Sequence, residues 1–145
     1  MADLVTLPAQ MLGGVIDTLP FAKRFQLIPD VFGRMDSALG QAGIFFAGPQ
    51  TALYRVDGDD MEIRIGVSLP KRLPGFTMFD VAETRALHVR HHGAFDTLPR
   101  VYQALSAEVE AQGLTRTGWA REVYRFMAKD SSLNICDVYM DVATA

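Results

Sequence analysis

The chain has 145 residues, of which 49% are hydrophobic and 21% charged, and its formal net charge is −3. This length suits a single domain with one buried core. Nucleic-acid binding needs clustered Lys and Arg, so the weak negative charge argues against direct contact with DNA or RNA. The single cysteine, Cys136, excludes an internal disulfide and a thiolate cluster for zinc.

The N-terminal segment lacks the basic start and the unbroken apolar run of a signal peptide or a membrane-spanning helix. Pro8, Gly13 and Asp17 interrupt its apolar residues, and the first basic residue is Lys23. We therefore expect a cytoplasmic protein with no membrane partner.

The first half of the chain predicts one helix among several strands. Its apolar residues alternate in the segments read as strands and recur at helical spacing in the segment read as a helix. The expected elements are a strand around Leu7–Ile16, a helix from about Pro29 to Ala42, a strand around Ala52–Val56, a turn at Asp57–Asp60 and a strand at Met61–Leu69.

The second half predicts the same order of elements. Asp96 or Thr97 is expected to cap its helix, Pro99 suits the first turn, and Gly113 suits the end because glycine tolerates a left-handed conformation. The expected elements are a strand over Thr77–Arg90, a helix from Pro99 to Gln112, and strands at Arg121–Met127 and Leu133–Val142.

An internal repeat explains this similarity. Residues 28–55 align without a gap on residues 98–125, and both turn glycines and a Tyr-Arg pair coincide. The identical pairs are Pro29/Pro99, Val31/Val101, Gly43/Gly113, Gly48/Gly118, Tyr54/Tyr124 and Arg55/Arg125. The apolar residues of the two segments also have the same spacing in this one alignment, which indicates duplication rather than coincidence.

The repeat predicts an α+β fold made from a duplicated β-α-β-β unit. We expect one antiparallel sheet with both helices on one face and the other face open as a concave ligand groove, which lies between pseudo-twofold-related halves. The chain is thus read as one domain, residues 1–145, made of two tandem repeats of about 1–74 and 75–145 that join near Pro74-Gly75.

Glu122 is the candidate ligand-binding residue that breaks the repeat. Its counterpart is Ala52, although the flanking positions match. Alternate strand residues share a face, so Glu122 and Tyr124 are expected to point the same way. A carboxylate beside aromatic rings suits a planar cation through charge neutralisation and cation–π contact. The alternative is a solvated strand glutamate.

Aromatic side chains are expected to line the groove around Glu122. Tyr102 is the counterpart of Phe32, so a core position is equally consistent with its pattern, and the matched Tyr54 and Tyr124 are also consistent with a purely architectural role. The candidates are Trp119, Tyr102, Tyr124, Tyr139, Tyr54 and Phe46.

Three histidines, His88, His91 and His92, lie near the end of one predicted strand. No Cys, Asp or Glu accompanies them at zinc-ligand spacing. We read them as a polar strand end, and we expect neither a metal nor a cofactor.

The second half carries a recognisable series of short motifs. They are HVRHHGAFDTLPRVYQALSAEVEAQGL over 88–114, REVY over 121–124 and the alternating strand ICDVYMDV over 135–142. This order resembles the GyrI-like family, which includes the effector-binding domains of AraC-type and MerR-type transcription regulators. The sequence departs from the family at Asp141-Val142, where members often carry Pro-Val.

The resemblance implies a duplicated β-α-β-β fold and a concave pocket for hydrophobic, often cationic aromatic molecules. It also implies that Glu122 is the buried anionic partner and that Tyr124 is the tyrosine of the E-x-Y strand. We expect a stand-alone bacterial domain that senses or sequesters a small molecule. It would lack the DNA-binding module of a complete regulator and act alone or through a regulator partner.

Two alternatives follow from the same family. Some GyrI-like proteins are hydrolases of strained electrophiles, which implies Glu122 as general base and Tyr124 or Tyr139 as proton donor. The family also takes its name from inhibition of DNA gyrase, which implies a protein partner, but the net charge of −3 is small for a mimic of DNA.

Overall fold

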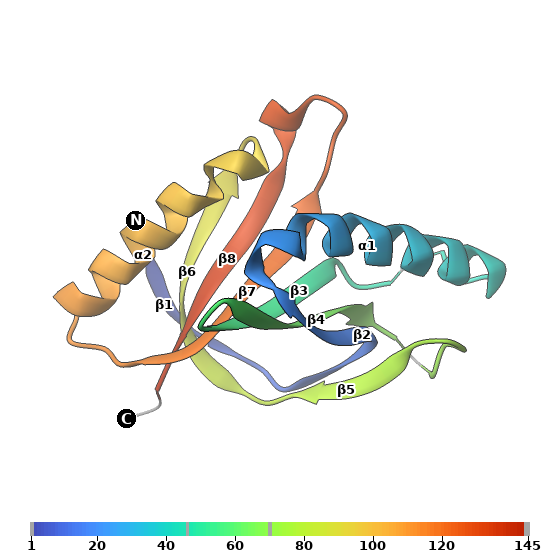
Figure 1. The fold of residues 1–145 in the computed structure, drawn as a ribbon, viewed down its shortest axis with the longest axis horizontal. Coiled ribbons are helices and arrows are strands. Elements are labelled where there is room, and N and C mark those ends of the chain that lie inside the picture. Colours follow the sequence, from blue (N-terminus) through green and yellow to red (C-terminus); the bar gives the residue numbers. More distant parts are fainter. Residues whose placement is uncertain (1, 46, 70, 144–145) are drawn as a thin grey trace. The chain divides into compact units, whose positions relative to one another are not determined.

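The computed structural model describes residues 2–45, 47–69 and 71–143, without the side chains of Arg24 and Phe25. The chain divides into two compact units, one formed by residues 9–82 and the other by residues 1–8 with 83–145. Each unit combines a helix with antiparallel strands (Figure 1). The α+β class predicted from the sequence is thus confirmed.

The unit of residues 9–82 contains one α-helix and, among its described residues, four strands in the order β5-β2-β4-β3. Its helix packs on β2 and β4. The elements are β2 (Gln10–Pro20), a 3-10 turn (Phe21–Lys23), α1 (Arg24–Gln41), β3 (Gln50–Asp57), β4 (Asp60–Ser68) and β5 (Thr77–Val81).

The unit of residues 1–8 and 83–145 repeats this topology. Its strands follow the order β1-β6-β8-β7, so β1 takes the place that β5 holds in the other unit. The elements are β1 (Asp3–Leu7), β6 (Thr84–His92), a 3-10 turn (Phe95–Thr97), α2 (Leu98–Ala111), β7 (Arg116–Phe126), a 3-10 turn (Ser131–Leu133) and β8 (Ile135–Val142). The predicted β-α-β-β unit therefore occurs twice.

The two helices end in the same way. Gly43 and Gly113 follow α1 and α2 with φ of 72° and 66°. After α1, the amide of Ile44 donates to the Leu39 carbonyl at 2.9 Å. After α2, the amide of Leu114 donates to the Val109 carbonyl at 3.0 Å. A positive φ is cheap only for glycine, so these residues end the helices as the sequence predicts.

Two predicted strands are each split in the structure. The strand expected over Thr77–Arg90 is β5 and β6, which separate after Val81 and pair with different neighbours, β2 and β1 respectively. The strand expected around Leu7–Ile16 is β1 and β2. Pro8 lies between those two and has no N–H for a strand ladder, which accounts for the break.

The starts of the helices also differ from expectation. The sequence predicted that α1 begins at about Pro29, but α1 begins at Arg24 and Pro29 lies inside it. Because proline has no N–H, the helix lacks one backbone hydrogen bond at this position. Thr97 occupies the N-cap position of α2 but makes no side-chain cap bond. Its hydroxyl donates instead to the Ala94 carbonyl at 2.6 Å.

Each unit has its own core. In the unit of residues 9–82, alternate residues of β4 are buried beneath α1, and Met61 and Ile65 are at most 1% exposed. In the other unit, Val138 and Met140 of β8 lie under α2, whose Leu105 is fully buried. Complete burial of such a side chain contributes about 2 kcal/mol to folding.

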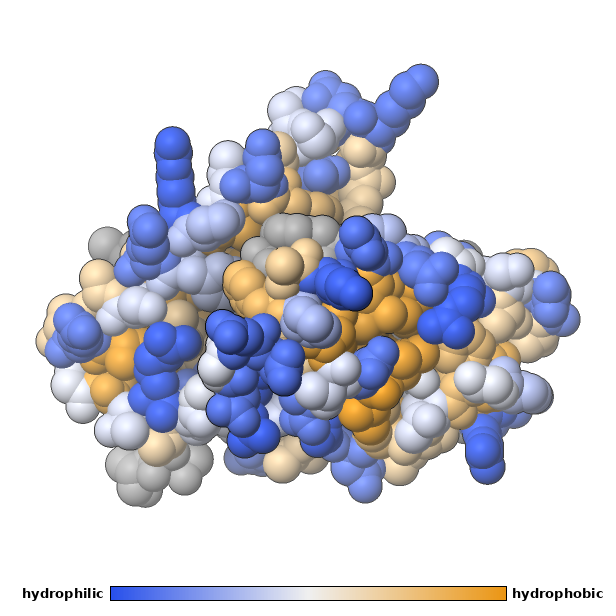
Figure 2. Space-filling model, in the orientation of Figure 1, coloured by the Kyte–Doolittle hydropathy of each residue, from blue (hydrophilic) through white to orange (hydrophobic). Residues whose placement is uncertain are grey.

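Hydrophilic side chains stand out over the face drawn in Figure 2, with hydrophobic residues visible between them. None of the helices in the described ranges is long and apolar enough to cross a membrane.

Candidate functional site

Glu122 lies in the middle of β7 on the face that α2 covers, whereas the sequence predicted the ligand groove on the face without helices. Glu122 pairs in register with Val138 of β8, while Tyr124 pairs with Cys136. Paired residues of antiparallel strands share a face, so the carboxylate lies next to the apolar row of β8. The Glu122 residue is 8% exposed and Tyr124 is 7% exposed. The structure therefore excludes the reading of Glu122 as a solvated strand residue.

Two tyrosines hold the Glu122 carboxylate from different elements. The Tyr124 hydroxyl donates to Oε1 and the Tyr102 hydroxyl, from α2, donates to Oε2, each at 2.5 Å. Phenol donors to a charged oxygen form short, strong hydrogen bonds. Each carboxylate oxygen thus has its own donor, and the orientation of the acid is set by both β7 and α2.

We call Glu122, Tyr102 and Tyr124 the Glu122 cluster, and Phe95 adds a further aromatic ring next to Tyr124. Its ring meets the Tyr124 ring edge-on, with centroids 5.3 Å apart and planes at 64°. Edge-to-face rings at this distance attract each other weakly and keep the ring of Tyr124 in place. Phe95 is not among the residues predicted from the sequence, because it lies outside the predicted strand and helix, in the 3-10 turn before α2.

Tyr139 lies on the opposite face of the same sheet from Glu122. It pairs with Arg121 and His88, stacks on the His88 ring at 4.7 Å and packs with Ala86 and Val123. Strand alternation separates it from Val138, which shares the face of Glu122. The structure therefore does not bring Tyr139 to the Glu122 cluster, and its role as a ligand-binding residue stays a prediction.

Of the remaining aromatic candidates, the structure describes Trp119 and Tyr54. Trp119 is half-buried beside a register shift of β7 between Arg116 and Ala120. Tyr54 is half-buried in β3, in the unit of residues 9–82. Phe46 lies outside the described residues.

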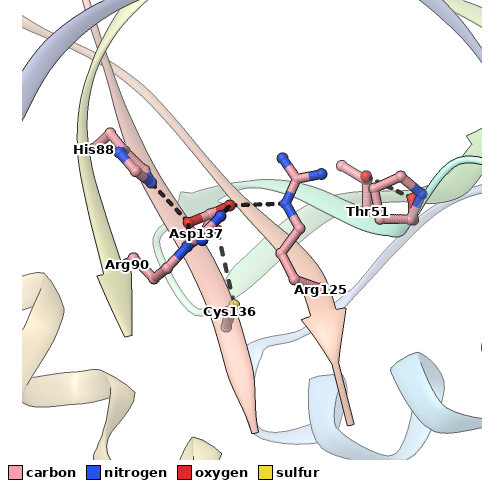
Figure 3. A network of polar contacts seen from close by, with 7 residues as sticks. Thr51, His88, Arg90, Arg125, Cys136 and Asp137 are labelled. Carbon is pink, nitrogen blue, oxygen red and sulfur yellow. Dashed lines mark hydrogen bonds and ion pairs between the residues drawn. The ribbon is translucent and has the colours of Figure 1, made fainter. Parts of the chain in front are cut away.

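Asp137 is the centre of a polar network on the face of Tyr139 (Figure 3). Its side chain is 2% exposed. His88 Nε2 lies 2.8 Å from Oδ1, Arg90 donates to both oxygens at 2.9 Å, and Arg125 donates to Oδ2 at 2.8 Å. Asp137 is also missing from the residues predicted from the sequence, although an acid inside the alternating strand ICDVYMDV was a signal that could have drawn attention to it.

The pKa of Asp137 reflects two opposing effects. Burial alone would raise it, but the hydrogen bonds from Arg90, His88 and Arg125 outweigh burial and hold the pKa well below its ordinary value. Asp137 is therefore charged at neutral pH and binds three side chains from β6 and β7 together.

Arg121 and Asp141 are two further buried charged residues on this face, at 3% and 8% exposure. Burial raises the pKa of Asp141 to about 6, and the nearby positive charge of Arg121 acts against this rise. Burial likewise lowers the pKa of Arg121. Within the described ranges, Arg121 Nε and Asp141 Oδ1 have no hydrogen-bond partner.

The histidines form local polar contacts. His88 contacts Asp137, and His91 Nε2 lies 2.8 Å from the Thr97 hydroxyl. In the part of the chain that the structure describes, no three His, Cys, Asp or Glu side chains are arranged to hold a metal ion. Cys136 is fully buried under α2, and burial strongly raises the pKa of its thiol, so it is unreactive as a nucleophile.

Comparison with protein-family models and with curated protein sequences finds no match. Solved structures do match over nearly the whole chain. SAV2435 bound to tetraphenylphosphonium has a TM-score of 0.73 at 15% identity, covering 99% of this chain and 94% of the other. The EcmrR C-terminal domain has a TM-score of 0.74 at 20% identity, covering 100% and 98%.

A hydrolase from Listeria innocua has a TM-score of 0.67 at 11% identity and covers 98% of this chain and 91% of its own. At these identities the likeness is one of fold. The chain therefore has the α+β fold that SAV2435, the EcmrR C-terminal domain and this hydrolase share.

Proposed function

We propose that the chain is a GyrI-like domain that binds small hydrophobic cations, with Glu122 as the counter-charge. The observation that carries this proposal is a carboxylate more than nine-tenths buried and oriented by two phenols. Keeping an acid in an apolar environment costs free energy, and a bound cation recovers part of that cost. A purely structural role would not require a charged group at this position.

The surroundings of Glu122 favour an aromatic cation with a spread charge. Tyr102 and Tyr124 contact the acid, and the Phe95 ring packs on the ring of Tyr124. The faces of aromatic rings attract cations and also offer apolar surface. The tetraphenylphosphonium bound by the similarly folded SAV2435 is such a molecule. We infer that ligands of this chemistry, rather than strongly hydrated small cations, are its targets.

The test is a calorimetric titration of the full chain with tetraphenylphosphonium. Wild type should bind saturably, and Glu122→Gln should weaken binding about tenfold or more, because it removes the charge while keeping the shape of the side chain. Glu110→Gln, on the exposed part of α2, is the matched control and should bind like wild type. Absence of saturable binding, or equal affinity in Glu122→Gln, would refute the proposal.

The hydrogen bond between Tyr124 and Glu122 also favours a second candidate function, hydrolysis of strained electrophiles. Glu122 would take a proton from the attacking water while Tyr124 protonates the leaving carbon or heteroatom, and the proton on Glu122 would then return to Tyr124. Incubation with epoxide- or cyclopropane-bearing compounds should give a hydrated product with wild type and none with Tyr124→Phe. Equal rates for the two proteins would exclude this function.

A further inference from the structure

The polar network around Asp137 is buried at its centre and exposed at its rim. The Asp137 side chain is 2% exposed, whereas the side chains of Arg90 and Arg125 are 52% and 40% exposed. Both arginines lie in the same unit as Glu122, on the opposite face of its sheet. Solutes can therefore reach the two arginines but not the acid that holds them.

Asp137 fixes the orientation of both guanidinium groups without using all of their donors. Arg90 donates to Asp137 through Nε and Nη2, and Arg125 donates through Nε. A guanidinium has five N–H groups, so each arginine keeps N–H groups on both terminal nitrogens that Asp137 does not use. Figure 3 shows the terminal nitrogens of Arg125 directed away from Asp137. Such paired donors match the oxygens of a phosphate or carboxylate group.

Asp137 also brings the two guanidinium groups together. Arg90 Nη2 and Arg125 Nε both donate to Asp137 Oδ2, at 2.9 and 2.8 Å. Two nitrogens bound to one oxygen are separated by no more than the two hydrogen-bond lengths together, so the guanidinium groups are close neighbours. A carboxylate has two oxygens and suits one pair of donors, whereas the three outer oxygens of a phosphate can accept from both arginines at once. The arrangement therefore favours a phosphate group.

The charge of this network is positive despite Asp137. Arg90 and Arg125 share this one acid as their ion-pair partner, which leaves one net positive charge at the rim. The exposed acid Asp3, which pairs with His88 from β1, is separated from Arg125 by β6 and β8. Neighbouring strands are about 4.8 Å apart, and exposed charges more than about 10 Å apart are largely screened, so Asp3 has little effect at Arg125.

The other repeat shows that the topology does not require this network. Strands β7, β8 and β6 are matched by β3, β4 and β2, and in this register Asp137 corresponds to Arg64 and Arg90 to Ile16. The register is fixed because Val123 pairs with Asp137 just as its counterpart in the repeat pairs with Arg64. The same strands thus pair with an apolar residue in place of Arg90 and with no acid in place of Asp137. Burying an acid is costly, so its presence in one repeat indicates a role beyond folding.

We propose that Arg90 and Arg125, which we call the arginine pair, bind the phosphate group of a small phosphomonoester. Asp137 holds the arginine pair from the inner side, and the phosphate oxygens accept N–H groups of both arginines on the solvent side. This site takes an anion, whereas the Glu122 cluster, on the other face of the sheet, is proposed to take a cation. The two sites are therefore independent, and the proposal does not rest on the function proposed above.

The test is a titration of ¹⁵N-labelled protein with inorganic phosphate at pH 7 and constant ionic strength, followed by the arginine Nε–Hε resonances. Saturable shifts are expected at Arg90 and Arg125, and none at Arg100, which is exposed on α2. Arg125→Gln should weaken phosphate binding about tenfold, because it removes one charged set of donors. His88 and Arg90 still donate to Asp137 in this variant, so it is expected to fold.

Three controls test whether phosphate binds specifically at the arginine pair. Arg100→Gln removes the same charge from an exposed position of the same unit and should bind phosphate like wild type. Glu122→Gln should also bind phosphate like wild type, which keeps the outcome independent of the tetraphenylphosphonium experiment. Acetate should bind wild type at least about threefold more weakly than phosphate, because it suits only one pair of donors.

Thermal unfolding checks that each variant is folded. If Arg125→Gln is not folded, the shifts of wild type and the comparison of phosphate with acetate decide the question. Shifts of the arginine pair that do not saturate, equal affinity in a folded Arg125→Gln, weakened binding in Arg100→Gln, or equal binding of acetate would overturn the proposal.

Discussion

The hydroxyl of Tyr102 and the carboxylate of Glu122 lie 2.5 Å apart, which joins α2 to β7 by a hydrogen bond between residues 20 positions apart in the chain. The acid therefore depends on a helix for its orientation, although it belongs to a strand. Any change that moves α2 relative to β7 would alter the donor set of Glu122 as well as the core beneath it.

Removal of the Tyr102 hydroxyl is expected to destabilise the protein through Glu122. Tyr102→Phe should lower the free energy of unfolding by about 1 kcal/mol, because the buried carboxylate loses a donor. In the Glu122→Gln background the same change should cost less, since the acceptor is no longer charged. Urea denaturation of the four proteins measures the coupling, and an equal cost in both backgrounds would contradict it.

Removal of the acid at the centre of the polar network should destabilise the other face of the same sheet. Asp137→Asn should lower the free energy of unfolding at pH 7 by about 2 kcal/mol, because three side chains lose their common counter-charge. The pKa of Asp137 is lowered in the folded state, so this stabilisation is present above about pH 4 and is lost as the pH falls further.

Denaturation at a series of pH values measures this difference. The gap between wild type and Asp137→Asn should shrink as the pH falls below about 4. Asp80→Asn, an exposed acid in β5, is the matched control and should unfold like wild type at every pH. A gap that stays constant with pH would show that the network does not depend on the charge of Asp137.

Asp141 is expected to give the opposite pH dependence. Its pKa is raised to about 6 in the folded state, so the associated stability is fully present below about pH 4 and is lost as the pH rises through 6. When the pH is lowered from 7 to 5, protonation of Asp141 should raise the free energy of unfolding by about 1 kcal/mol. Asp141→Asn should lack that gain. If its pH dependence over this range matched that of wild type, the prediction would be wrong.

Two glycines should respond in opposite ways to alanine. A Cβ at Gly14 would lie 1.8 Å from the Ile65 carbonyl oxygen, because β2 and β4 approach closely there. Gly14→Ala should lower the free energy of unfolding by about 3 kcal/mol. A Cβ at Gly33, within α1, meets nothing within 4 Å, and Gly33→Ala should raise stability by about 0.5 kcal/mol. Thermal unfolding compares the pair, and destabilisation by Gly33→Ala would contradict the helix argument.

Local patterns were sufficient for the parts of the fold that depend on neighbouring residues. The helix-ending roles of Gly43 and Gly113 follow from the conformational freedom of glycine, and the repeat was visible because the same local signals recur in one register. The special position of Glu122 was also readable, since the matched residue Ala52 is small and apolar.

Contacts between distant segments were not readable in this way. Strand alternation placed Tyr124 on the face of Glu122, but the pairing of β8 with β7 and β6 is what puts Tyr139 on the other face with His88 and Arg121. The pairing of β1 with β6 likewise joins residues far apart in the chain. Register between such strands depends on the whole set of buried faces and not on any short pattern.

In the Glu122 cluster, too, some contacts follow from local sequence and others depend on segments that are distant in the chain. The acid and Tyr124 share a strand, so their common direction follows from the two-residue period of the β-structure. Tyr102 and Phe95 reach the cluster only because α2 packs on β6 and β8 and the turn before α2 carries Phe95 to Tyr124. The sequence thus identified the charge, whereas the packing of the helix on the sheet buried that charge and supplied its donors, because burial is a property of surfaces that meet in space.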